Sequence, residues 1–315
     1  MSVAAKVGKK IIWTVNGLVN LFVLIVILLL LAFGCYAIWD SNQVHHMASS
    51  TRYQAFRPTV ENEGASFADL QATNPDVFAW LTVYGTNINY PVVQGQDNIR
   101  YVNTSAEGKH SLSGAIFLDF RSSPNFSDFS SILYGHHMDN ATMFGEIGMF
   151  HDAGYFNARR YGSLYFDGKE HGLEFFAFVH ADAYDNSVFR TRIAEQEDQQ
   201  AYLNMLIDMA VYSRDDTVVT TEDRIVLLST CSPNSTNGRD ILIGKITETI
   251  PDDPFLAERT DSPLAIPTID RLASSWGQAG LWIKISITLL PCLLILLIII
   301  IIHKKRRYRR KEKRG

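Results

Sequence analysis

Cysteine, histidine and arginine side chains occur in this chain at positions that suit joint chemistry. Cys231 ends a short apolar stretch of strand character, residues 225–231, and Arg239 follows eight residues later. His136 ends an earlier stretch of the same kind, directly after Gly135. A thiol attacks as its thiolate, and a neighbouring imidazole or guanidinium lowers the pKa of that thiol. The three side chains therefore suit acyl transfer through a thioester, with histidine moving protons and arginine stabilising the oxyanion.

The placement of the cysteines supports this chemistry. Cys35 and Cys292 lie inside long apolar runs, and Cys231 is the third cysteine, between those runs. An exported domain with one cysteine has no internal disulfide, so its thiol is either buried and inert or kept for a reaction. An inert thiol would suit a two-span surface adhesin or receptor, the alternative from another class of protein. Rapid labelling of Cys231 by a small thiol reagent would argue against that alternative.

Two apolar runs are long enough to cross a membrane. Residues 11–39 and 285–302 contain no charged side chain, and basic residues flank them within 6–10 and 304–315. A spanning helix needs about 20 apolar residues, and flanking Lys and Arg mark the cytoplasmic side. We therefore expect a two-pass plasma-membrane protein with both termini cytoplasmic and the central part extracellular. A cleavable signal peptide has an apolar region of only about 7–15 residues, so the first run is interpreted as a retained anchor.

The spans divide the chain into seven expected segments. The basic tail beside the second span is expected to contact anionic membrane lipid. The segments are a cytoplasmic N-terminus (1–10), a transmembrane helix (11–39), a polar stalk (40–65), a catalytic domain (66–250), a linker (251–280), a second transmembrane helix (281–303) and a basic cytoplasmic tail (304–315).

The extracellular part is strongly acidic. Three of the 29 basic residues precede the first span, and ten basic residues and one of the 33 acidic residues lie from Lys284 onward. The part between keeps 16 basic and 32 acidic residues, a net charge of −16. That charge argues against nucleic acid as a partner and suits a domain beside an anionic cell wall.

Short strands dominate the expected secondary structure of this part, which indicates a mainly β fold closed into a barrel or a sandwich. A helical pattern over 193–212 is the main exception, and its apolar stripe is expected to pack on the sheet. The expected strands are 77–83, 88–93, 114–120, 131–134, 161–166, 173–181, 224–230 and 241–246.

Several of these segments resemble the sortases, a family of cysteine transpeptidases. The sequence Leu228-Ser229-Thr230-Cys231 followed by Arg239 is similar to the sortase active-site signature, and so is the strand 131–136 that ends in Gly-His. Segments 74–83 and 88–95 resemble the first two sortase strands. Segments 114–121 and 135–145 are most similar to the class B branch, and the resemblance spans roughly residues 66–248.

The resemblance implies a closed eight-stranded β-barrel with peripheral helices. It also implies that Cys231 attacks the bond after a threonine in the C-terminal sorting signal of a surface protein, forming a thioester that an amine resolves. His136 would be the general acid and base, in preference to the adjacent His137, and Arg239 would hold the substrate and the oxyanion. Ser229 and Thr230 would add polar contacts to substrate or oxyanion. No cofactor and no metal are expected, since His45, His46 and His151 lack a ligand pattern.

The acceptor amine has two candidates. The class B likeness favours attachment to a cell-wall precursor, whereas a second membrane span is commoner among sortases that polymerise pilins. On balance the sequence favours wall attachment. A cysteine L,D-transpeptidase is the second enzyme considered, but that family has Gly and His next to its cysteine, and here His136 lies about 95 residues upstream.

Overall fold

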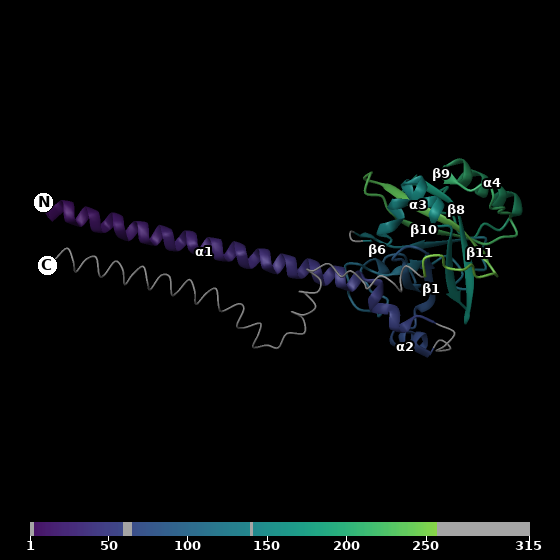
Figure 1. The fold of residues 1–315 in the computed structure, drawn as a ribbon, viewed down its shortest axis with the longest axis horizontal. Helices are drawn as coiled ribbons and strands as arrows, with labels where there is room; N and C mark the ends of the chain where they lie inside the picture. Colours follow the sequence, from purple (N-terminus) through teal and green to yellow (C-terminus); the bar gives the residue numbers. More distant parts are fainter. Residues whose placement is uncertain (1–2, 59–64, 139–140, 257–315) are drawn as a thin grey trace. The chain divides into compact units, whose positions relative to one another are not determined.

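The computed structural model describes residues 3–58, 65–138 and 141–256 of the chain (Figure 1). The helices are α1 (Val3–Ala48), η1 (Ser50–Phe56), α2 (Ala65–Thr73), η2 (Arg100–Val102), η3 (Gly145–His151), α3 (Ala153–Ala158) and α4 (Gln196–Asp208). The strands are β1 (Val77–Val83), β2 (Asn89–Val93), β3 (Ile116–Leu118), β4 (Ser130–Tyr134), β5 (His137–Met138), β6 (Thr142–Met143), β7 (Tyr161–Phe166), β8 (Lys169–Asp182), β9 (Ala210–Ser213), β10 (Ile225–Cys231) and β11 (Gly238–Thr247).

Eight of these strands form a closed barrel. Neighbouring strands follow the order β11-β10-β4-β3-β2-β1-β7-β8, and β8 pairs with β11 to close the ring. The β4–β10 and β2–β3 pairs are parallel, and the other neighbours in the ring are antiparallel. Closure pairs the backbone groups that an open sheet would leave at its edges. The expected eight-stranded barrel is thereby confirmed.

Strand β10 is apolar on both faces because each face meets a different core. Val226 and Leu228 belong to the larger hydrophobic cluster, which fills the barrel. Ile225 and Leu227 belong to a second cluster outside the barrel. Side chains alternate between the two faces of a strand, so this split follows directly from the sequence. Helix α4 covers the outer cluster with its expected apolar stripe and lies beside β8 and β9 (Figure 1).

The expected strands are all present, with ends that shift by a few residues. The helix expected over 193–212 is shorter, because α4 ends at Asp208 and Ala210–Ser213 form β9 instead. Strand β7 pairs with the first part of β8, up to Glu174, and β9 pairs with residues 177–179 further along. The part of β8 beyond Glu174 is not paired with β7, and its backbone groups pair with β9 instead. Residues 210–213 therefore form a strand, although the local sequence pattern indicated a helix up to residue 212.

Helix α1 contains the first expected span. Ile11–Asp40 is the segment of the described residues that is long and apolar enough to cross a membrane. The same helix continues to Ala48, whose carbonyl accepts a 2.9 Å hydrogen bond from the Tyr90 hydroxyl of β2. In η1, Tyr53 is buried against the barrel. Part of the expected stalk therefore packs on the catalytic domain. The expected second span at 281–303 and the basic tail lie outside the described residues.

Candidate active site

Cys231 and Arg239 face each other across the β10–β11 hairpin. The two residues are register partners at the end of this antiparallel pair where the loop 232–237 joins the strands. The Arg239 guanidinium donates through Nη1 to the Cys231 Sγ at 2.6 Å. Cys231 is exposed and Arg239 is half-buried. The hairpin therefore presents the Cys231 side chain to solvent with the Arg239 guanidinium against its sulfur.

The third expected residue, His136, follows the strand on the other side of Cys231. Strand β4 runs parallel to β10, with Tyr134 opposite Ser229, and the Gly135 amide donates to the Ser229 carbonyl at 3.2 Å. The register ends at this pair, and continued for two residues it would bring His136 level with Cys231. The role expected for His136 beside the thiol stays a prediction.

Gly135 shows why the strand ends in Gly-His. A Cβ at this position would lie 2.5 Å from Ile116 Cδ1 and 2.7 Å from Phe144 Cδ2. Both neighbours are buried core residues, so a larger residue would displace packed side chains. Glycine lets the chain leave β4 close against this core and positions the next residue, His136, at the strand end.

The His136 ring is anchored by a backbone group. Its Nε2 lies 2.8 Å from the Val102 carbonyl oxygen, at the end of η2. A carbonyl oxygen only accepts hydrogen bonds, so Nε2 carries the proton in this contact. In the neutral imidazole Nδ1 is then the nitrogen that is free to take up a proton.

His137 has a different environment. It begins β5, and its Nδ1 is buried with no hydrogen-bond partner among the described residues. A Cβ on Gly148 of η3 would lie 3.6 Å from the Cε1 of this ring and 3.6 Å from Asp240 Oδ2. His137 therefore points into the loop structure beside η3.

Ser229 and Thr230 are buried, at 1% and 2% exposure. Their hydroxyl oxygens have no hydrogen-bond partner among the described residues. Strand alternation puts Thr230 on the face opposite Cys231, in register with Asp240. Their expected contacts with substrate or oxyanion stay a prediction, and in the free protein the hydroxyls do not face solvent.

A buried carboxylate stabilises the sheet next to this site. Asp119, fully buried after β3, accepts from the Tyr134 hydroxyl at 3.2 Å and pairs with Arg121 at 2.8 Å. Burial raises the pKa of Asp119, but hydrogen bonds from Arg121 and Asn98 outweigh burial and hold that pKa below its usual value. Burial raises the pKa of Tyr134, and so does the neighbouring Asp119 charge. The ends of β3 and β4 are thereby tied together two residues before His136.

The sequence of this chain is similar to that of known proteins. No family model matches the chain. The chain is 32% identical over 190 residues to Sortase B of Staphylococcus aureus, which covers 59% of this chain and 76% of that relative. The chain belongs to the class B sortases. It is therefore a cysteine transpeptidase, as the resemblance implied.

Solved structures agree with that assignment. The sortase matches sortase B from the type II pilus of Streptococcus pneumoniae with a TM-score of 0.52 and 46% identity, covering 58% of this chain and 99% of that one. It matches a class B sortase of Streptococcus pyogenes involved in pilus biogenesis with a TM-score of 0.53 and 40% identity, covering 58% and 99%.

Sequence reasoning missed the Val102 carbonyl that anchors His136. A backbone acceptor leaves no mark on the side-chain pattern, and residues 102 and 136 lie in separate elements. The parallel pairing of β4 with β10 could not be predicted either. Two strands that lie far apart in the chain carry no local sequence signal that they are neighbours in the sheet.

Proposed function

We propose that this class B sortase joins pilus subunits through a thioester on Cys231. The thiolate attacks the carbonyl carbon of the threonine in a sorting signal, and the C–N bond between this threonine and the next residue breaks. His136 gives a proton to the leaving amine. An acceptor amine then attacks the thioester, loses a proton to His136 and releases the thiolate, so that the enzyme returns to its starting state.

The 2.6 Å contact between Arg239 Nη1 and Cys231 Sγ is the observation that carries the assignment of roles. A guanidinium at that distance holds hydrogen-bond donors against the attacking sulfur. It also lies next to the carbonyl oxygen of an acyl group on Sγ, where negative charge develops. His136 is supported by its register with Cys231 and by the free Nδ1 that the Val102 contact leaves.

Replacement of Cys231 tests whether this residue is the nucleophile. Full-length sortase is mixed with candidate sorting peptides and an amine, and acyl-enzyme and product are followed by mass spectrometry. Cys231→Ala is expected to abolish both, because no thiolate remains at the strand end. Cys35→Ala is the matched control, since Cys35 is the other free cysteine of the described residues and lies in α1. Turnover by Cys231→Ala would contradict the proposal.

Sequence identity to pilus-linked relatives is the reason for proposing a pilus subunit as the acceptor. The sequence on its own favours wall attachment, but the two pilus-linked sortases share 46% and 40% identity with this chain, against 32% for Sortase B of Staphylococcus aureus. This difference supports subunit polymerisation.

Wall extracts from a strain that lacks the gene decide between the acceptors. Loss of a high-molecular-weight ladder, restored by the wild-type gene and not by Cys231→Ala, is expected. Release of a single-size protein into the medium, with the ladder intact, would instead establish wall attachment. Either result leaves the thioester chemistry as it is.

A further inference from the structure

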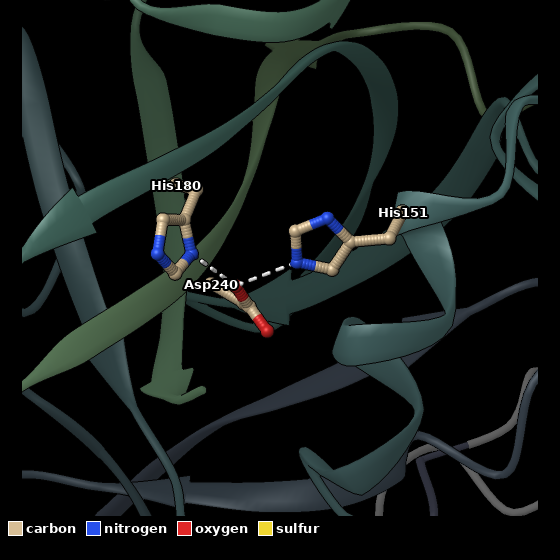
Figure 2. Close-up of side chains that lie close together, drawn as sticks. All are labelled: His151, His180 and Asp240. Carbon is tan, nitrogen blue, oxygen red and sulfur yellow. Dashed lines mark hydrogen bonds and ion pairs between the residues drawn. The ribbon is translucent and has the colours of Figure 1, made fainter. Parts of the chain in front are cut away.

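Three side chains with metal-binding atoms meet at one end of the barrel, on the face of β11 opposite Arg239. His151 ends η3, His180 lies in β8 and Asp240 lies in β11. Their candidate ligand atoms all lie within 4.8 Å of one another. Figure 2 shows the two imidazoles on either side of one carboxylate.

We propose that His151, His180 and Asp240 bind one divalent transition-metal ion, with Zn²⁺ the best match. Two imidazole nitrogens and one carboxylate oxygen are a ligand set that suits Zn²⁺, whereas Mg²⁺ and Ca²⁺ favour oxygen ligands alone. A fourth position would remain for water. This site is separate from the thiol chemistry and adds a binding function to the enzyme.

The carboxylate is the strongest reason to expect an ion. Asp240 is fully buried, and both contacts go to its Oδ1: His151 Nε2 at 3.0 Å and His180 Nδ1 at 2.8 Å. Its Oδ2 is buried and has no hydrogen-bond partner among the described residues. A buried carboxylate oxygen without a partner is costly, and a cation bound there would remove that cost.

The imidazoles are held in place and remain accessible. The His151 ring packs edge-on against Phe178 with 4.9 Å between ring centroids, and its backbone carbonyl accepts from the Tyr212 hydroxyl at 3.0 Å. Gly238 gives room for the other ring, since a Cβ there would lie 2.7 Å from His180 Cε1. The two imidazole side chains keep 33% and 35% exposure, which leaves a path for an ion from solvent.

The present spacing needs only small movements to accept an ion. Zn–N and Zn–O bonds of about 2.0–2.2 Å in a tetrahedron separate ligand atoms by roughly 3.4 Å. The hydrogen-bonded pairs here are 2.8 and 3.0 Å apart. Loss of the two imidazole protons from these contacts, by a change of tautomer, turns both nitrogens into metal ligands.

Bound metal would cross-link three elements of the catalytic end. Asp240 follows Arg239 and lies in register with Thr230, which precedes Cys231. An ion here would fasten η3 and β8 to the inner face of the hairpin whose outer face carries the thiol and the guanidinium. We therefore expect Zn²⁺ to raise the Tm of the protein.

Equilibrium dialysis against ZnCl2 followed by metal analysis tests the site. The parent is the full-length chain with Cys231→Ala, so that the exposed thiol does not bind the ion. One bound ion per chain is expected, and His110→Gln, which changes an exposed histidine, should leave binding unchanged. The double variant His151→Gln/His180→Gln should bind more than about 100-fold more weakly, because even outer partners of metal ligands change affinity about 10–100-fold.

Further measurements test whether the double variant folds and whether the ion binds at the proposed site. Circular dichroism and the metal-free Tm verify that the double variant folds, and the single variants replace it if it does not. Zn²⁺ should raise the Tm of the parent and not that of the double variant. Co²⁺ bound in the parent should lack a thiolate charge-transfer band. No Zn²⁺ binding by the parent, binding that survives both histidine exchanges, or a thiolate band would each overturn the proposal.

Discussion

The thiol of this sortase is controlled by side chains from neighbouring strands. Arg239 reaches Cys231 across an antiparallel hairpin, and His136 follows the parallel strand β4 beside β10. A cross-strand pair needs little rearrangement to maintain its contact, because the sheet sets the separation of the two backbones. Under the proposed mechanism, the guanidinium is thus preorganised beside the sulfur where the oxyanion would develop.

Arg239→Lys should lower kcat/KM for peptide cleavage by about 10²–10³-fold. An ammonium retains the charge but loses the rigid fork of donors that contacts Sγ and the oxyanion. Arg160→Lys is the matched control, since Arg160 forms ion pairs with Glu174 and Asp216 and lies between α3 and β7, which carry none of the residues proposed for catalysis. Initial rates with a quenched fluorescent sorting peptide measure both variants. Near wild-type rates for Arg239→Lys would remove Arg239 from the mechanism.

The two adjacent histidines should behave differently. His136→Ala should lose nearly all transpeptidation, because the ring level with Cys231 would be gone. His137→Ala should reduce the rate modestly, through loss of packing beside Gly148. Single-turnover mass spectrometry separates acylation from resolution in each variant. The reverse order of effects would make His137 the proton carrier.

At the scale of elements, buried polar groups tie strand ends together beside the site. Asp119 links the end of β3 to Tyr134 of β4 and to Asn98 in the preceding loop. Its side chain is fully buried, so its partners must satisfy the charge. Loss of the Asp119 carboxylate should loosen the end of β4, which precedes His136.

Asp119→Asn should lower the free energy of unfolding by about 1.5–3 kcal/mol at pH 7, the range for hydrogen bonds to charged groups. Because the folded pKa of Asp119 lies below its ordinary value, the stabilisation is present above about pH 4 and is lost as the pH falls through the folded pKa. The Tm difference between wild type and variant should therefore shrink in acid. Asp215→Asn, at an exposed turn position, should show no such pH-dependent difference. A constant difference down to low pH would contradict this role.

At the scale of the whole molecule, one candidate membrane span is within the described residues and a second is expected from sequence. Ile11–Asp40 in α1 is long and apolar enough to span. Residues 285–302 are uncharged and are followed by a strongly basic tail. With two spans, the positive-inside rule would put both termini in the cytoplasm, and this topology stays a prediction.

Protease added to intact protoplasts should digest the catalytic domain and leave an epitope on residues 304–315 protected. The expectation follows from two spans that return the chain to its starting side. An epitope in the loop between β9 and β10 is the control for access, since Val218 there is 73% exposed. Digestion of the tail epitope in intact protoplasts would exclude the two-pass topology.

The sequence by itself determined the strands, the first span, the family and the three residues now proposed for catalysis. Strand alternation, long uncharged runs and motifs such as Gly135-His136 depend on near neighbours in the chain, so they are readable without a structure. The same local reading placed a helix over residues 209–212, where pairing with β8 selects a strand instead.

Only the tertiary structure decided which distant residues meet. The parallel pairing of β4 with β10 brings Tyr134, two residues before His136, opposite Ser229, two residues before Cys231, and the pairing of β8 with β11 brings His180 to Asp240. His151, His180 and Asp240 are separated by 29 and 60 residues in the chain, so no spacing rule predicts their contact. Closure of the barrel brings them together, because it pairs strands whose sequences lie far apart.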